Sequence, residues 1–115
     1  MKIRKEYSCP LEIVHDFTRG KWKIIIIYQL NKGPNSLSGL QKIIVGISQK
    51  MLIESLNELI EFDIVTKKKS LGYPLQVEYK LTEDRGKKMV EAISIMQQIG
   101  REYMKENKMG RFKED

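Results

Sequence analysis

One stretch of this sequence, residues 46–61 (GISQKMLIESLNELIE), leaves few choices of local structure. Its larger apolar side chains recur at the three- and four-residue spacing of a single helix face. Ser48 stands just before that pattern, where a hydroxyl can accept a hydrogen bond from the free amides of a first turn. The sequence therefore predicts an amphipathic helix with one polar side and one buried stripe, formed by Leu52, Leu56, Leu59 and Ile60.

The polar side of this predicted helix is a candidate DNA-reading surface. A helix in the major groove contacts base edges through its N-terminal turns, where glutamine and lysine suit purine edges. The residues there are Ser48, Gln49, Lys50, Met51 and Glu54. Glu54 can accept a hydrogen bond from cytosine or repel a phosphate, and the sequence leaves both open. The alternative for the whole side is an ordinary solvated helix surface.

The preceding segment, residues 36–44, has the same pattern on a smaller scale. Leu37, Leu40 and Ile44 share one helical face, and Ser36 can cap the first turn. A short break containing glycine, residues 45–47, separates this helix from the longer one. Two helices joined in this way are typical of a helix-turn-helix, and there we expect Ser38 and Ser48 to reach phosphates.

A β-hairpin is predicted next, over residues 64–81. Its second half alternates apolar Leu75, Val77, Tyr79 and Leu81 with polar residues, and residues 71–74 are of turn-forming types. The first half carries Lys67, Lys68 and Lys69. A basic hairpin after a helix-turn-helix can lie along a phosphate backbone as a wing. The alternative is a solvated lysine run that protects an edge strand from aggregation.

The charge distribution agrees with a polyanionic partner. The chain has a formal charge of +6, from 21 Lys and Arg against 15 Asp and Glu. Six basic and three acidic residues lie in residues 1–23, and four basic and one acidic lie in residues 64–81. The surplus thus flanks the predicted reading helix, as expected if phosphate contacts surround a nearly neutral base-reading surface.

Helices are also predicted at both ends of the chain. Residues 10–19 begin with Pro10, which suits a first turn, and we expect His15 and Asp16 on the polar side of this helix. Residues 21–30 contain four consecutive isoleucines and have helix length between two glycine-containing breaks. A last helix over about residues 82–106 is expected to be capped by Thr82.

The last predicted helix carries an apolar stripe that is long for so small a domain. Its residues are Met89, Ile93, Met96, Ile99 and Tyr103. We expect a dimer interface there, because helix-turn-helix proteins commonly read two half-sites as two-fold pairs. The alternatives are a stripe that packs only on its own domain and a methionine-rich face that holds a small ligand.

Taken together, the elements predict an α+β, mostly helical fold. It is a winged helix-turn-helix with a two-stranded β wing and an additional C-terminal dimerisation helix. We expect a single domain over residues 1–115, with the helix-turn-helix at about 36–62, the wing at about 64–81, and dimer helices at about 10–19 and 82–106.

Several function classes lack support in the sequence. No apolar run approaches the roughly 20 residues that a membrane span needs, so a cytoplasmic protein with no membrane partner is expected. One cysteine and one histidine leave neither a disulfide framework nor a zinc site. Motifs for catalysis or phosphate binding are missing as well, so we expect no enzyme, no cofactor and no metal.

Four motifs occur in an order that resembles the HxlR-type family of bacterial winged helix-turn-helix regulators, which are related to the MarR group. They are Cys9-Pro10-Leu11-Glu12, Gly20-Lys21-Trp22-Lys23, the run Gly46-Ile47-Ser48-Gln49-Lys50-Met51-Leu52, and Pro74 followed by Val77-Glu78-Tyr79 and Leu81-Thr82-Glu83. The resemblance covers about residues 9–100. It implies a homodimer joined through the N- and C-terminal helices, which binds double-stranded DNA at a palindromic operator and controls transcription.

The resemblance also draws attention to Cys9, because some members of this family sense oxidants or electrophiles through the matching cysteine. A thiol at a helix start, near Arg4 and Lys5 in sequence, is favoured as the reactive thiolate. With no second cysteine, its oxidised partner would be Cys9 of another subunit or a small thiol. The alternative is a small apolar residue buried at the dimer seam.

The sequence departs from the family pattern at two places. Ile99-Gly100 stands where Trp-Gly is frequent, which leaves the packing of the dimer helix open. Lys67 to Lys69 replace the arginines that are common in the wing, which implies a less rigid phosphate grip.

The sequence thus predicts a DNA-binding repressor, with a winged-helix protein-interaction module as the alternative. Only the repressor should bind with a steep salt dependence.

Overall fold

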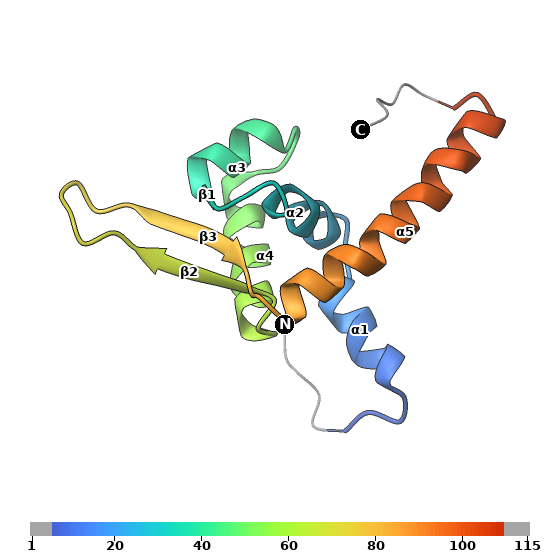
Figure 1. The fold of residues 1–115 in the computed structure, drawn as a ribbon, viewed down its shortest axis with the longest axis horizontal. Helices are drawn as coiled ribbons and strands as arrows, with labels where there is room; N and C mark the ends of the chain where they lie inside the picture. Colours follow the sequence, from blue (N-terminus) through green and yellow to red (C-terminus); the bar gives the residue numbers. More distant parts are fainter. Residues whose placement is uncertain (1–5, 110–115) are drawn as a thin grey trace.

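The structure is a computed structural model that describes residues 6–109. Figure 1 shows a helical body from which a β-hairpin projects on one side and a long helix on the other. The elements in chain order are α1 (Pro10–Thr18), α2 (Trp22–Leu30), β1 (Asn35–Ser36), α3 (Leu37–Ile43), α4 (Gln49–Glu61), β2 (Val65–Lys69), β3 (Val77–Leu81) and α5 (Arg85–Glu106). The predicted fold class, a mostly helical winged helix-turn-helix, is confirmed.

The helix-turn-helix forms with the predicted caps. The Met51 amide donates to Ser48 Oγ at 3.1 Å, and the Gly39 amide donates to Ser36 Oγ at 3.0 Å. Gly46 lies between the two helices with a φ of 92°, a conformation that glycine adopts without steric cost. Local sequence thus determines where α3 and α4 begin and how the chain turns between them.

The core lies where α2, α4 and the start of α5 meet the sheet. The isoleucine run of α2 is helical as predicted, and the buried apolar residues of this helix are Ile26, Ile27 and Leu30. Of the stripe predicted for α4, Leu52, Leu56 and Leu59 are inaccessible to solvent, and Ile60 is half-buried. Because α2 packs against both α4 and α5, it holds α4 in a fixed position relative to the C-terminal helix.

The sheet has three antiparallel strands in the order β1-β3-β2. The hairpin strands pair from Val65↔Leu81, beside the core, to Lys69↔Val77 at the outer end. The third strand, β1, pairs Asn35 with Tyr79 and was not predicted, because two residues are too short to show an alternating pattern. It joins the hairpin to the start of α3 and so orients the wing relative to the helix-turn-helix.

The start of α5 differs from the prediction. The helix begins at Arg85, and Asp84, not Thr82, is at the capping position. Thr82 Oγ1 still accepts from the Gly86 amide at 2.8 Å, and its hydroxyl donates to the Asp63 carbonyl at 2.9 Å. A Cβ on Gly86 would lie 2.6 Å from the Ile64 carbonyl oxygen, so close packing of α5 on the sheet requires glycine here.

A buried polar cluster joins the N-terminal segment to α4. The prediction that Asp16 lies on the polar side of α1 is wrong, since this carboxylate is buried and Tyr7 Oη donates to it at 2.9 Å. Lys23 is buried as well: its Nζ lies 2.8 Å from Glu58 Oε2 and 3.3 Å from the Asp16 carbonyl. The spacing of apolar residues along α1 and α2 did not predict that Asp16 and Lys23 are buried, because side chains of other segments cover them.

Candidate nucleic-acid interface

The first turns of α4 present a continuous polar surface. All five residues predicted to read DNA are exposed: Ser48, Gln49, Lys50, Met51 and Glu54. They project from the side of α4 opposite the buried leucines, so no conformational change is needed to expose them. Ser48 has a second task, because its Oγ already accepts the Met51 amide as the helix cap. Ser38 is exposed at the start of α3, and its hydroxyl lies 3.3 Å from Ser36 Oγ.

One side of this surface is bordered by basic residues that site prediction from the sequence did not include. A depression of about 410 Å³ lies between the α1–α2 connection and α4. Arg19 and Lys21 line it on one side, and Met51 and Ser55 line it on the other. The Lys21 ammonium lies 4.5 Å from the centroid of the Trp22 ring, which orients it beside the depression. The N-terminal charge surplus in the sequence was the available indication of this border.

The wing carries a second group of basic residues. Lys67, Lys68 and Lys69 are all exposed, but they form part of β2 and precede the loop at its end. Side chains alternate between the two faces of a strand, so the register separates them. Lys67 shares a face with its partner Tyr79, and Lys68 shares the opposite face with Glu78. The three lysines therefore cannot all contact a flat partner that covers one face of the sheet. A phosphate backbone that runs along the edge strand β2 can contact ammonium groups from both faces.

The loop at the end of the wing, residues 70–76, is apolar. The expected alternation of apolar residues continues only to Val77, because the core ends there, and Leu75 is 71% exposed instead of buried. Leu71 and Tyr73 are fully exposed. Residues 71–74 were predicted only as a turn. The three large apolar side chains at positions 71, 73 and 75 were the available indication of an apolar surface.

Cys9 is exposed at the N-terminal end of α1, immediately before the first helical residue. Its side chain makes no capping hydrogen bond. The Glu12 carboxylate folds back over this end of the helix, where it accepts from the Ser8 amide at 3.0 Å and from the Ser8 hydroxyl. Arg4 and Lys5, which were expected near the thiol, lie outside the described residues. Exposure of Cys9 in the single chain agrees with both predicted roles, a reactive thiol and a small residue packed at a dimer seam.

The apolar stripe of α5 is divided between core and surface. Ile93 is only 4% exposed and belongs to the protomer's own core, and Met89 packs against that core. Met96, Ile99 and Tyr103 are each more than half exposed, together with Ile95. The surface open to a partner therefore begins beyond Ile93 and is shorter than the predicted stripe.

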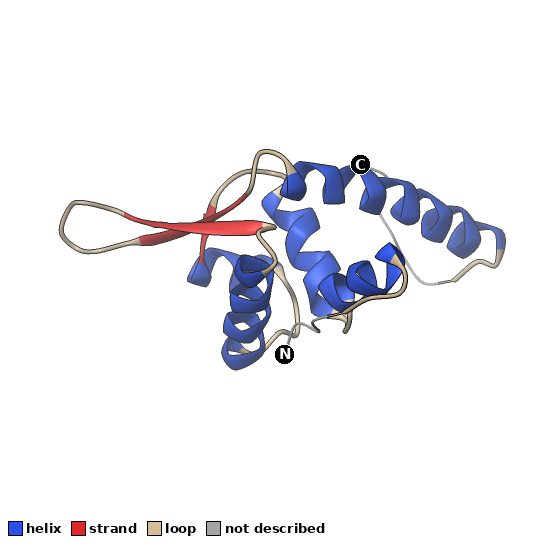
Figure 2. Ribbon diagram, turned by 90° about the horizontal axis from the view of Figure 1, so that it is seen from below, coloured by secondary structure: helices blue, strands red, loops and turns tan. Residues whose placement is uncertain are grey.

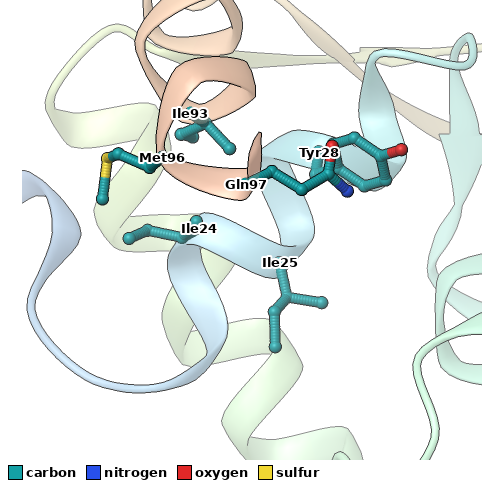
Figure 3. Close-up of a pocket in the computed structure, with 6 residues that line it drawn as sticks. All are labelled: Ile24, Ile25, Tyr28, Ile93, Met96 and Gln97. Carbon is teal, nitrogen blue, oxygen red and sulfur yellow. The ribbon is translucent and has the colours of Figure 1, made fainter. Parts of the chain in front are cut away.

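An apolar groove of about 300 Å³ runs between α2 and α5. It is lined by Ile24, Ile25, Tyr28, Ile93, Met96 and Gln97 (Figure 3). The groove continues into the exposed part of the α5 stripe through Met96. It offers apolar surface to either an incoming helix or a small ligand.

The described residues contain no group of three or more His, Cys, Asp or Glu side chains arranged to hold a metal ion. Within residues 6–109, no helix combines the length and the apolar character that crossing a membrane requires.

Comparison with known proteins gives consistent results. The sequence model of one family, HxlR-like helix-turn-helix, matches residues 17–108. An uncharacterised HTH-type transcriptional regulator of Bacillus subtilis (strain 168), YkvN, is 42% identical over 79 residues, which are 69% of this chain and 67% of that protein.

Solved structures of two regulators share the fold. The redox regulator HypR in its reduced form has a TM-score of 0.76 and 32% identity, over 82% of this chain and 92% of that one. The reduced form of the transcriptional regulator YodB from B. subtilis has a TM-score of 0.71 and 34% identity, over 79% and 89% of the two chains.

Proposed function

Because this chain belongs to the HxlR-like helix-turn-helix family, whose members are transcriptional regulators and not enzymes, we propose that it represses transcription by binding a palindromic operator as a homodimer. The observation that carries the proposal is the layout of one surface. Met51, in the exposed first turns of α4, lines one depression with Arg19 and Lys21, and the exposed lysines of the wing supply a second basic group.

Each part of this surface has a separate task in the proposal. Gln49, Lys50 and Met51 approach base edges in the major groove, since they occupy the N-terminal turns of an exposed helix. Arg19, Lys21 and the wing lysines neutralise phosphates on either side, which positions α4 but carries no sequence information. Ser38 adds a hydroxyl for a phosphate oxygen, and Glu54 accepts a hydrogen bond from cytosine or repels a phosphate.

The exposed part of the α5 stripe supports the homodimer. Met96, Ile99 and Tyr103 leave a large apolar surface in water, and such surfaces commonly mark interaction sites. A two-fold pair of these helices would carry two copies of α4 and so match a palindromic site. Leu11 and Val14 of α1 are also exposed and extend the apolar surface available to the partner.

Regulation by oxidation is the finer part of the proposal. HypR is described as a redox regulator, and this chain shares its fold and 32% of its sequence over the aligned part. Cys9 is exposed at a helix start, where an oxidant can reach it. As the sequence has one cysteine, the oxidised thiol would join Cys9 of the other subunit or a small thiol.

The experiment is binding of the purified protein to genomic DNA fragments, including the region upstream of its own gene, at low and moderate salt. A few discrete fragments should be retained, and affinity should fall as salt rises because counterions are released from the DNA. Gln49→Ala should lower discrimination for the retained site by about 1–3 kcal/mol. Lys87→Ala, an exposed change on α5, serves as the matched control and should leave binding unaltered.

Treatment with a mild thiol oxidant tests the role of Cys9. Wild type should release its operator on oxidation, and Cys9→Ser should keep it. If wild type stays bound after oxidation, the regulator remains and Cys9 is not its sensor. If no fragment is preferred over bulk DNA, operator binding is wrong, and a winged-helix module that docks a protein partner becomes the better interpretation.

A further inference from the structure

The apolar loop at the end of the wing has no role in the contacts proposed so far. Leu71, Tyr73 and Leu75 expose most of their surface there, and Figures 1 and 2 show the hairpin extending clear of the helices. The base of the loop is closed, because the Ser70 amide donates to the Gln76 carbonyl at 2.7 Å and the Gln76 amide donates to Ser70 Oγ at 2.9 Å. These hydrogen bonds close the base of the loop that carries the three apolar side chains.

Large apolar side chains gathered at an exposed end usually mark a binding surface. The charges around the loop indicate which kind of partner it suits. No acidic residue occurs between Asp63 and Glu78, and Lys67, Lys68 and Lys69 directly precede the loop. An apolar end on a cationic support is complementary to a DNA groove, whose rim is anionic phosphate and whose walls and base stack are apolar.

We propose that Leu71, Tyr73 and Leu75 enter the minor groove of the operator and wedge against a base step, so that the wing bends the DNA as well as gripping its backbone. The inference rests on the proposed operator binding and extends it to a second mode of sequence selection. Proteins that bind the minor groove insert apolar side chains in this way and kink the duplex toward the major groove.

The dimensions of the hairpin agree with this placement. The hairpin has five residue pairs, from Val65↔Leu81 at the core end to Lys69↔Val77 at the outer end. At a rise of about 3.3 Å per residue, the four steps between them span roughly 13 Å, and the loop adds to this reach. The minor groove lies about half a helical turn, or roughly 17 Å, from the adjacent major groove. The hairpin, which starts beside the C-terminal end of α4, is therefore long enough to span a separation of this size.

The wedge makes a distinct prediction about sequence preference. Pyrimidine–purine steps unstack more easily than other steps, so the energy of deformation depends on the sequence at the wing. The operator should therefore favour such a step outside the bases that α4 reads. A wing that contacts phosphates alone would show little preference there.

The test compares Leu71→Ser/Tyr73→Ser with Lys68→Gln on one operator fragment retained by wild type. DNA bending is measured by energy transfer between dyes at the fragment ends, and unstacking by the fluorescence of 2-aminopurine placed at the wing-proximal step. Wild type should bend the fragment and increase the fluorescence. The double variant should lose both responses and bind at least about tenfold more weakly, a change of about 1.4 kcal/mol.

Lys68→Gln is the matched control, because it removes a phosphate contact from the same hairpin. It should weaken binding and reduce the slope of log affinity against log salt by about one, while bending and fluorescence persist. The double variant should keep the wild-type salt slope, and an unchanged thermal unfolding curve shows that its fold is intact.

Three results would overturn the wedge, and they are distinguishable. If wild type prefers no fragment, operator binding itself fails and the wedge fails with it. If wild type binds but the double variant matches its affinity, bending and fluorescence, operator binding stands and the wedge is wrong. If the double variant instead loses binding to anionic phospholipid vesicles while DNA bending is unaltered, the loop belongs to a membrane surface.

Discussion

Removal of one partner of the ion pair between buried Lys23 and half-buried Glu58 should strongly destabilise the fold. The Nζ and Oε2 atoms of the pair are 2.8 Å apart, and the two side chains are only 6% and 25% exposed. Glu58→Gln keeps the shape but leaves the ammonium with an uncharged partner in a largely dry position. Breaking a fully buried pair costs about 3–5 kcal/mol, and partial exposure of Glu58 lowers our expectation to about 2 kcal/mol.

The reverse change should cost less, and this asymmetry tests the reasoning. Lys23→Met leaves the Glu58 carboxylate, which is the more exposed partner and can turn toward water. We expect a loss of about 1 kcal/mol, and a coupling energy of about 1 kcal/mol when the two changes are combined, since contacting residues are not additive.

The assay is urea unfolding followed by the fluorescence of Trp22. This residue is the only tryptophan in the chain and directly precedes Lys23, so its emission reports on the packing at this site. The free energy of unfolding follows from linear extrapolation to zero denaturant. All variants are compared at one protein concentration, because formation of the proposed homodimer would also stabilise the folded state.

A surface pair in α5 provides the matched control. Lys88 Nζ lies 3.1 Å from Asp84 Oδ1, but the two side chains are 75% and 84% exposed. Lys88→Met should change the free energy of unfolding by no more than about 0.5 kcal/mol, because water and salt screen exposed pairs. If Glu58→Gln is no more damaging than Lys88→Met, burial does not strengthen the Lys23–Glu58 pair and the reasoning is refuted.

Three further predictions concern the helices. Ser48→Ala should lower the free energy of unfolding by about 1 kcal/mol through loss of the helix cap, as measured by urea unfolding. Ser48→Asp should keep the cap and the stability but abolish operator binding in a gel-shift assay, because its carboxylate repels phosphate. Gly86→Ala should lower the free energy of unfolding by about 1–3 kcal/mol, because the new Cβ would meet the Ile64 carbonyl oxygen, and a variant as stable as Lys87→Ala would contradict this. Ile99→Glu should give monomers in analytical ultracentrifugation and weaken operator binding, and a stable dimer would place the interface elsewhere.

The local parts of the structure were already determined by the sequence. The caps at Ser36 and Ser48, the turn at Gly46 and the buried stripe of α4 depend on residues within one or two helical turns of each other. Such short-range patterns predict where elements begin and which side they bury. The hairpin and its basic strand were predictable for the same reason, as were the exposed residues at the start of α4.

The tertiary structure alone decided how these elements combine. The pairing of β1 with β3, the burial of Asp16 and Lys23, and the core position of Ile93 depend on segments that are distant in sequence. A helical stripe does not show where its own core ends, so the sequence did not distinguish the buried Ile93 from the exposed Ile99. The exposure of the apolar loop was also decided by tertiary structure. Leu71, Tyr73 and Leu75 are exposed because the hairpin extends beyond the core. The alternation of apolar residues along the chain does not show where the core ends.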